Sequence, residues 1–310
     1  MITRLDVDQA ATRTQGLTRV TPLLAADPST FAGPVWFKCE YLQHTGTFKA
    51  RGALNKILAS QERGELRQDA GVVVASGGNA GLANAYAAAR LGIPATVFVP
   101  ESAPAVKVQK IKAIGATVVQ GGAEYAVAYE AALAHAEETG AVYCHAYDQP
   151  EIAAGAGVVG VELLTQLPDV ETILVAVGGG GLMAGIAAAV EGRTKVVAVE
   201  PESAPSLHAA LEAGQPVDVA VSGIAADSLG ARRIGEIGWS VAVRTGVGSV
   251  LVTDADIIAA RSVLWSQYRI VVEHGAAAAF AALTSGAYTP APGEQVAVIL
   301  CGANTDPATL

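Results

Sequence analysis

The chain has 310 residues, of which 51% are apolar and 16% are charged, and its formal net charge is −9. At about 100–200 residues per domain, this length predicts roughly two domains. The composition excludes a disordered segment, a coiled coil and a collagen-like repeat. The acidic balance, without a block of Lys and Arg, argues against nucleic acid or an anionic membrane as the main partner.

The cysteines and the N-terminal residues indicate the cellular compartment. Cys39, Cys144 and Cys301 are widely spaced and form no Cys-x-x-Cys pair, which is typical of a reducing compartment. Asp6 and Asp8 stand where a signal peptide would have its apolar core. No apolar run approaches the ~20 residues that a membrane span needs. We therefore expect a cytoplasmic protein without a membrane segment.

From about Gly71 onward, short β-branched runs alternate with alanine-rich stretches of helical period. The expected strands are 71–75, 94–100, 116–120, 141–147, 172–177, 195–200 and 294–300. The expected helices are 81–92, 103–115, 123–139, 181–192, 254–268 and 275–285. Strands without polar alternation, separated by helices, are typical of parallel sheets that are covered on both faces. The predicted class is α/β.

Four consecutive glycines, 178–181, lie between an expected strand and an expected helix. They allow a sharp turn and leave backbone N–H groups exposed at a helix N-terminus, which predicts a phosphate site rather than a simple turn. Gly179, Gly181 and Ala184 also fit the dinucleotide fingerprint, and Glu200 stands where a ribose-binding acid belongs. By itself, this segment predicts NAD.

Lys49 follows a Thr/Gly turn and begins a helical stretch. Its neighbours Phe48, Ala50, Ala53 and Leu54 are apolar, and burial lowers a lysine pKa toward that of a nucleophilic amine. An ordinary solvated lysine is the alternative at this point.

Two further loops follow expected strands. Residues 76–81 (SGGNAG) present helix-start amides, which bind a carboxylate as readily as a phosphate, although Ser76 or Asn79 could also cap the helix. Cys301 follows the last strand, at the sheet edge where ligands usually bind in parallel folds. A buried structural cysteine is the alternative for Cys301.

In this order and spacing, these elements resemble the fold-type II pyridoxal-phosphate (PLP) enzymes, specifically the serine/threonine dehydratase and serine racemase branch. The matching motifs are TPLL (21–24), GTFKARGA (46–53), SGGNAG (76–81) with AYAAARLGIPATVFVP (85–100), the tetraglycine loop, VAVEPESA (197–204), VEHGAAAA (272–279) and LCGANTD (300–306). The resemblance covers nearly the whole chain. We favour PLP over NAD, because a dinucleotide would leave the lysine motif, SGGNAG and LCGANTD without a role.

The resemblance implies a fold of two closely packed parallel-sheet lobes, similar to the tryptophan synthase β chain. Residues 46–146 would form a small lobe that carries the asparagine loop. Residues 1–45 and 147–310 would form a large lobe that binds the PLP phosphate. By the same resemblance, we expect a homodimer that acts on a small amino acid. Since the chain ends soon after LCGANTD, we also expect no C-terminal regulatory domain.

The resemblance also implies a role for each site residue. Lys49 would be the Schiff-base lysine, Phe48 would cover one ring face, and Asn79 would bond to the ring hydroxyl. Cys301 would meet the pyridine nitrogen. The phosphate would lie in a cup formed by Gly178, Gly179, Gly180, Gly181 and Leu182. The substrate carboxylate would be bound by Ser76, Gly77, Asn79 and Ala80.

A structural cation is a further implication of the resemblance. Its ligands would be the Glu200 carboxylate, the Ser206 hydroxyl and the carbonyls of Ala204, Leu229 and Ala231. Because Ser206 stands where racemase-like members tend to carry Asp, the lower ligand charge favours potassium over a divalent ion.

The expected reaction is the PLP-dependent elimination of water from L-serine or L-threonine, which gives a 2-oxo acid and ammonia. Lys49 would remove the Cα proton. Gly77 stands where racemases carry a serine, so little racemisation is expected, and the neutral Cys301 thiol favours elimination over a long-lived carbanion.

Several alternatives remain at this stage. They are serine racemisation, β-replacement of the cysteine-synthase type, a non-catalytic amino-acid-binding protein and, more distantly, an NAD-dependent dehydrogenase. Ala80 and Ala303 depart from the residues usual in the family, His and Gly, and this affects the expected carboxylate loop and substrate size.

Overall fold

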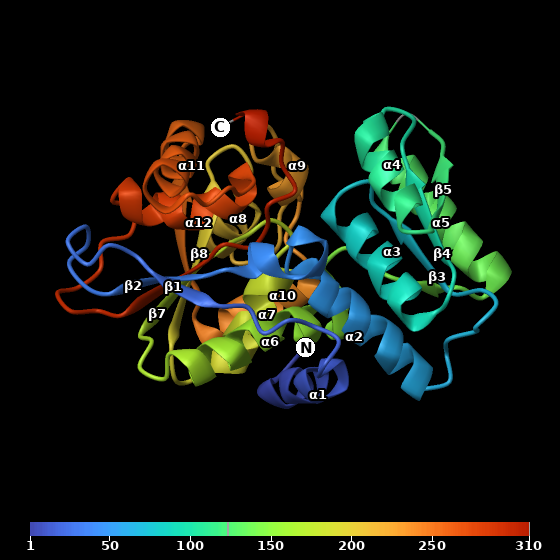
Figure 1. Cartoon of the computed structure of the whole chain (residues 1–310), viewed down its shortest axis with the longest axis horizontal. Helices are drawn as coiled ribbons and strands as arrows, with labels where there is room; N and C mark the ends of the chain where they lie inside the picture. Colours follow the sequence, from blue (N-terminus) through green and yellow to red (C-terminus); the bar gives the residue numbers. More distant parts are fainter. Residues whose placement is uncertain (123, 310) are drawn as a thin grey trace.

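The computed structural model describes residues 1–122 and 124–309, which fold around two separate sheets that lie in two lobes (Figure 1). Ala123, the first residue of the helix expected over 123–139, and Leu310 lie outside the described residues. The predicted α/β class is confirmed. None of the described helices is both long and apolar enough to cross a membrane.

The larger sheet has six strands in the order β1-β2-β10-β7-β8-β9. Their bounds are Leu23–Ala25 (β1), Val35–Lys38 (β2), Thr172–Ala176 (β7), Lys195–Pro201 (β8), Gly248–Val252 (β9) and Val296–Ile299 (β10). Only the β1–β2 pair is antiparallel among the described strands of this sheet. The carboxyl ends of β10, β7 and β8 therefore meet at one edge.

Helices cover both faces of the six-stranded sheet. They are Arg4–Thr14 (α1), Pro150–Gln166 (α6), Gly181–Val190 (α7), Ser206–Ala213 (α8), Ala226–Leu229 (α9), Glu236–Thr245 (α10), Asp254–Tyr268 (α11) and His274–Thr284 (α12). In Figure 1, α11 and α12 lie on one side of the sheet and α6, α7 and α10 on the other. A Cβ atom at Gly157 of α6 would lie 2.5 Å from the carbonyl oxygen of Gly185 in α7, so these helices pack with their backbones nearly in contact.

The smaller sheet has four parallel strands in the order β5-β4-β3-β6. The strands are Val72–Ala75 (β3), Ala95–Val99 (β4), Thr117–Gln120 (β5) and Val142–Tyr143 (β6). Helices Asn79–Leu91 (α3) and Ala105–Ala113 (α4) lie on one face, and Tyr125–Thr139 (α5) lies on the other. As expected, α3 ends at a left-handed glycine, Gly92, with φ 70°.

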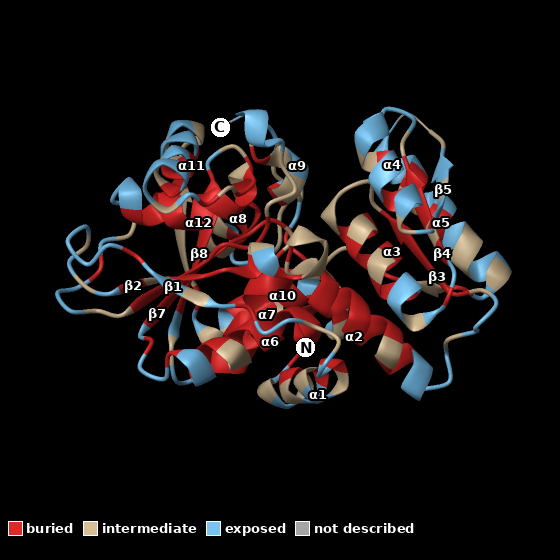
Figure 2. Ribbon diagram, in the orientation of Figure 1, coloured by how far each residue is buried: buried red, intermediate tan, exposed pale blue. Residues whose placement is uncertain are grey.

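Helix α2, Lys49–Glu62, lies between the two lobes and packs against α6, α3 and α1. Most of its residues are buried, as Figure 2 shows. The 3-10 turns Glu40–Leu42 (η1) and His44–Gly46 (η2) lead into it, and Pro307–Thr309 (η3) lies near the C-terminus. Because α2 contacts helices of both lobes, the lobe boundaries at 45/46 and 146/147 stay predictions.

A buried network of charged side chains holds the first turn of α2. The Arg51 guanidinium donates to Glu40 at 2.8 Å and to Glu162 at 2.7 Å, and the Lys38 ammonium donates to Glu162 at 2.7 Å. Lys38, Glu40 and Arg51 are fully buried. Removal of one member would leave an uncompensated buried charge. The network therefore fixes the backbone that carries Lys49.

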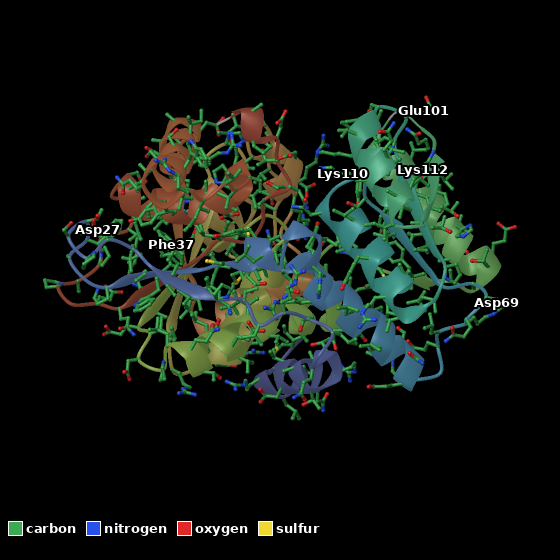
Figure 3. All side chains as sticks on the ribbon, in the orientation of Figure 1. Asp27, Phe37, Asp69, Glu101, Lys110 and Lys112 are labelled. Atoms are coloured by element: carbon green, nitrogen blue, oxygen red, sulfur yellow. The ribbon has the colours of Figure 1, made fainter. Side chains whose placement is uncertain are left out.

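Apolar side chains fill the space between the large sheet and its helices. Phe37 of β2 is fully buried, and its ring meets those of Tyr268 and Phe280 edge to face, with centroids 5.0 and 5.2 Å apart. By contrast, the labelled side chains of Asp69, Glu101 and Lys112 stand at the surface (Figure 3). This division leaves the junction of the two lobes as the place where polar groups enter the interior.

Candidate active site

A cavity of about 830 Å³ lies between the two lobes. The loops that line it follow the carboxyl ends of parallel strands: Ser76 follows β3, Gly178 follows β7 and Cys301 follows β10. Ligands in parallel α/β folds bind at this edge, because the loops there converge and the helix N-termini point toward it. The two sheets present their carboxyl edges to the same cavity.

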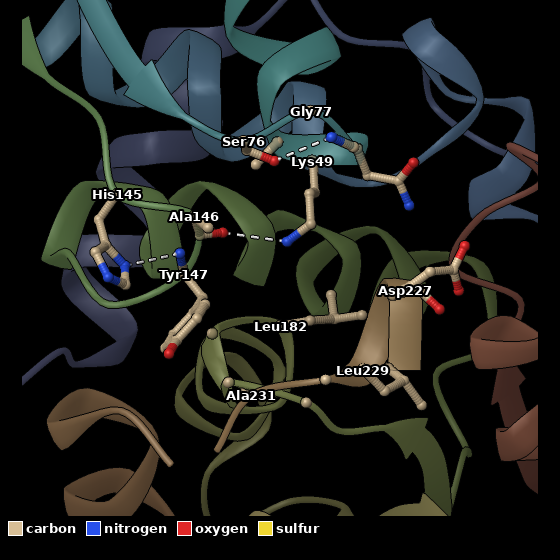
Figure 4. A pocket seen from close by; sticks show the side chains of 18 of the residues that line it. Lys49, Ser76, Gly77, His145, Ala146, Tyr147, Leu182, Asp227, Leu229 and Ala231 are labelled. Carbon is tan, nitrogen blue, oxygen red and sulfur yellow. Dashed lines mark hydrogen bonds between the residues drawn. The ribbon is translucent and has the colours of Figure 1, made fainter. Parts of the chain in front are cut away.

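Lys49 extends into the centre of this cavity from the first turn of α2 (Figure 4). Its Nζ atom donates a hydrogen bond to the Ala146 carbonyl at 3.1 Å and lies 4.9 Å from the centre of the Phe48 ring. Burial lowers the pKa of Lys49, although Cys301 and Glu273 act in the opposite direction. A desolvated lysine of this kind is available as a neutral amine, a nucleophile or a base.

The tetraglycine loop leads directly into α7, and contacts on both sides leave no room for side chains. A Cβ atom at Gly178 would lie 2.8 Å from the backbone of Leu229, and one at Gly181 would lie 2.6 Å from the Tyr147 carbonyl. Gly180 has φ 87°, a conformation that favours glycine. The first N–H groups of α7 have no partner within the helix. The loop therefore offers a close-fitting cradle for a phosphate group.

The loop 76–80 forms the wall of the cavity on the side of the small lobe. The Ser76 hydroxyl accepts a hydrogen bond from the Gly78 amide at 3.2 Å, and α3 begins at Asn79. A Cβ atom at Gly77 would lie 3.3 Å from a methyl group of Val99, a contact that a small shift relieves. The loop thus brings helix-start N–H groups to the cavity, where they can bind a carboxylate.

Cys301 lies in the cavity wall and is buried. Burial raises the pKa of its thiol, and the nearby Glu273 carboxylate acts in the same direction. The thiol is therefore neutral at physiological pH. A neutral group at this position cannot stabilise a positive charge on a heteroaromatic nitrogen.

Three cavity residues had no role in the sequence interpretation. His145 and Tyr147 follow β6, and Glu273 precedes α12. The His145 Nδ1 atom accepts the Tyr147 and Asp148 amides at 3.2 and 2.8 Å, so a neutral ring carries its proton on Nε2. The rule that selected Cys301, a side chain just after a buried strand, could have found His145 and Tyr147.

All the residues that the resemblance assigned to the cofactor and the substrate line this one cavity, although they come from distant segments. They are Phe48, Lys49, Ser76, Gly77, Asn79, Ala80, Gly178, Gly179, Gly180, Gly181, Leu182 and Cys301. The structure brings them together; the role of each stays a prediction.

The residues expected to bind a cation lie partly behind the tetraglycine loop. Both Glu200 carboxylate oxygens accept backbone N–H groups of α8, from Leu207 and His208, at 2.8 Å each. The Ser206 hydroxyl donates to the Gly178 carbonyl at 2.7 Å. Burial raises the pKa of Glu200 to about 7. These contacts connect Glu200 to the proposed phosphate cradle.

The other expected cation ligands are the carbonyls of Ala204, Leu229 and Ala231. The Leu229 carbonyl already accepts the Ala231 amide at 2.9 Å. Within residues 1–122 and 124–309, no group of three or more His, Cys, Asp or Glu side chains could hold a metal ion. The cation site stays a prediction.

Comparison with known proteins decides the family. A family model described as pyridoxal-phosphate dependent enzyme matches residues 14–302. The chain belongs to this family. It is 41% identical over 281 residues to an L-threonine ammonia-lyase of Geobacter sulfurreducens, covering 89% of this chain and 69% of that protein. It is 35% identical over 311 residues to an L-threonine ammonia-lyase of Thermotoga maritima, covering 99% and 76%.

Solved structures of the family have the same fold. Maize serine racemase superposes with a TM-score of 0.92 at 30% identity, covering 99% of this chain and 95% of that one. The threonine deaminase of T.th. superposes with a TM-score of 0.90 at 35% identity, covering 98% and 99%. The predicted resemblance to the fold-type II enzymes and the predicted architecture are confirmed.

Proposed function

We propose that this member of the family is a lyase that eliminates water from L-serine or L-threonine and releases a 2-oxo acid and ammonia. The observation that carries the proposal is the buried Lys49 amine, which shares one cavity with a glycine cradle for a phosphate and a neutral thiol. Two L-threonine ammonia-lyases among the relatives support this reaction.

The residues of the cavity fit pyridoxal phosphate. The loop 178–182 would hold the phosphate, because a Cβ atom would fill the space beside its glycines and because the α7 N-terminus attracts anions. Lys49 would bond to the aldehyde, Phe48 would face the ring, Asn79 would meet the ring hydroxyl, and Cys301 would meet the ring nitrogen. When bound, this cofactor withdraws electrons from the substrate Cα.

The side chains of this protein would then position the substrate and move its proton. The N–H groups of the loop 76–80 would bind the substrate carboxylate and orient the Cα–H bond toward Lys49. The Lys49 Nζ atom, freed by the incoming substrate, would take the Cα proton, and its lowered pKa makes it a base near neutral pH. The buried walls of the cavity limit access of water to the reacting carbon.

Serine racemisation is the second candidate, because maize serine racemase has the same fold. Racemisation needs a second acid or base on the opposite side of the Cα atom. We place Gly77 there, and glycine carries no titratable group. We therefore propose elimination as the main reaction and racemisation as a minor one.

The remaining expectations are part of the same proposal. Potassium would bind near Glu200, where an oxygen-rich set with one carboxylate suits a monovalent cation. The protein would work in the cytoplasm as a homodimer, and its free cysteines are consistent with a reducing compartment.

The test is the release of 2-oxo acid and ammonia from L-serine and L-threonine by the purified protein, with O-acetylserine and sulfide as the β-replacement assay. Lys49→Ala should abolish release, whereas Lys56→Ala, on the same helix but outside the cavity lining, should keep it. Borohydride reduction should label Lys49. An unlabelled protein, or one in which Lys49→Ala retains activity, contradicts the proposal.

A further inference from the structure

One polar residue of the cavity, Asn79, takes part in a chain of side-chain hydrogen bonds that the proposed reaction does not require. The Asn304 Nδ2 atom donates to the Thr45 carbonyl at 2.9 Å and to the Asn79 Oδ1 atom at 2.8 Å. The Asn79 Nδ2 atom in turn donates to the two carboxylate oxygens of Glu273 at 2.9 and 3.1 Å. Four residues thus form one continuous chain along the cavity wall.

The two ends of this chain determine the orientation of both amides. A backbone carbonyl, here that of Thr45, can only accept a hydrogen bond, and so can an ionised carboxylate such as Glu273. Asn304 must therefore present its NH₂ group to Thr45, and the same group reaches the Asn79 oxygen. The Asn79 nitrogen is left to face Glu273. A flipped Asn79 amide would place oxygen against carboxylate and NH₂ against NH₂.

This arrangement leaves one N–H bond of Asn79 available to a ligand. The two oxygens of a carboxylate are close together, whereas the two hydrogens of an amide nitrogen diverge widely, so Glu273 takes only one of them. The side chain of Asn79 lines the cavity. Its second hydrogen is therefore a donor for an oxygen atom in the cavity.

The position of Glu273 is itself tightly determined. Its side chain is buried, and its backbone N–H donates to the Gly302 carbonyl at 3.1 Å. A Cβ atom at Gly302 would lie 2.5 Å from the Glu273 Oε1 atom, so this glycine gives the carboxylate its space. Within the described part of the chain, Glu273 has no Lys, Arg or His at ion-pair distance. The Asn79 amide is its direct side-chain partner.

The same hydrogen bonds connect the two lobes. Asn79 begins α3, which packs on the four-stranded sheet, whereas Glu273 precedes α12 and Asn304 follows β10 of the six-stranded sheet. The partners of Asn79 are 194 and 225 residues away in the sequence. The amide can keep its orientation only while the two lobes hold this relative position.

We propose that Glu273 and Asn304 are positioning residues that hold the Asn79 amide with one N–H directed into the cavity, as the donor to the ring oxygen of the cofactor. The orientation of the amide follows from the side-chain contacts alone. The identity of the acceptor rests on the proposed function.

An exchange of hydrogen-bond polarity tests the contact between Asn79 and Glu273 in the cofactor-free full-length chain. Asn79→Asp keeps the shape of the side chain but places two carboxylates in contact, so the unfolding midpoint should fall by about 3 °C or more. Glu273→Gln in the same chain supplies an NH₂ donor and should recover most of that loss. Asn84→Asp, on the same helix and not bonded to Glu273, is the matched control that Glu273→Gln should not rescue.

Cofactor binding to the same variants tests the donor. The double variant Asn79→Asp with Glu273→Gln has no N–H at position 79 to offer, so its dissociation constant for PLP should rise about tenfold or more despite its restored stability. The absorption spectrum of bound PLP should shift in parallel. Glu273→Gln alone keeps an oxygen acceptor for Asn79 and should bind PLP more tightly than Glu273→Ala.

The outcomes separate this inference from the proposed function. Absence of stability rescue, or equal rescue of Asn84→Asp, overturns the inference, and so does wild-type PLP affinity in the double variant. If Asn79→Asp does not fold, Asn304→Asp should be less stable than Asn304→Ala, because it places an acceptor against the Thr45 and Asn79 oxygens; the reverse order overturns the inference. A wild-type protein that fails to bind PLP contradicts the proposed function, and the stability comparison in the cofactor-free chain still decides the contact.

Discussion

Glu40→Gln tests whether the buried charged network holds the catalytic helix. Glu40 is fully buried and accepts two hydrogen bonds from Arg51, at 2.8 Å each, and one from Thr21. Glutamine keeps the volume but leaves Arg51 and Lys38 with one carboxylate, Glu162. Loss of one member of a buried pair costs about 3–5 kcal/mol, so the unfolding midpoint should fall by roughly 6–12 °C. Thermal unfolding followed by circular dichroism measures this change.

The matched control for Glu40→Gln is Glu65→Gln, which removes an exposed partner of Arg63 and should change stability by less than about 1 kcal/mol. The pH dependence supplies a second test. Burial alone would raise the pKa of Glu40, but Arg51 and Lys38 outweigh it and lower the pKa. The stabilisation is therefore present above the unfolded value, near 4.5, and is lost as the pH falls through the lower folded value. Equal midpoints for Glu40→Gln and wild type would refute the reasoning.

The remaining predictions concern the cavity. Gly77→Ser should increase the rate of D-serine formation from L-serine, since only a small shift of Val99 is needed to admit the side chain; chiral chromatography measures this, and an unchanged D-serine yield contradicts the placement of Gly77. Gly179→Ala should weaken PLP binding at least tenfold by fluorescence titration, as its Cβ atom would collide with the Tyr147 ring, and tight binding would refute the cradle. Because burial raises the pKa of Glu200 to about 7, stability without a cation should fall as the pH rises from about 4.5 to 7. Potassium should restore it relative to tetramethylammonium, and Glu200→Gln should remove both effects.

Long, regular segments could be predicted from the sequence. The strand expected at 172–177 occurs as Thr172–Ala176, and the helix expected at 254–268 has the same bounds in the structure. Helix α6, Pro150–Gln166, was missed, because it is rich in Gly, Ala and Val and buried on nearly every side, so it shows no amphipathic period. Strands β1 and β9 were missed as well, since they are short and only partly buried.

The candidate site was predictable to the extent that it follows local rules. Glycines between a strand and a helix predict an anion site, and a lysine among apolar residues predicts a perturbed amine, wherever these segments lie in space. The contact of Asn79 with Glu273 follows no such rule, because it joins residues 194 positions apart. Glu273 belongs to a motif quoted from the sequence, yet its role came only from its position beside Asn79.

The amino-acid sequence therefore determined the class of fold, the family and the loops that carry the chemistry, since each depends on a short pattern of residue types. The tertiary structure decided which of those loops share a cavity, how deeply Lys49 is buried and which way the Asn79 amide points. These properties arise from desolvation and from hydrogen bonds between distant segments. Both depend on how the two lobes pack against each other, which no local pattern encodes.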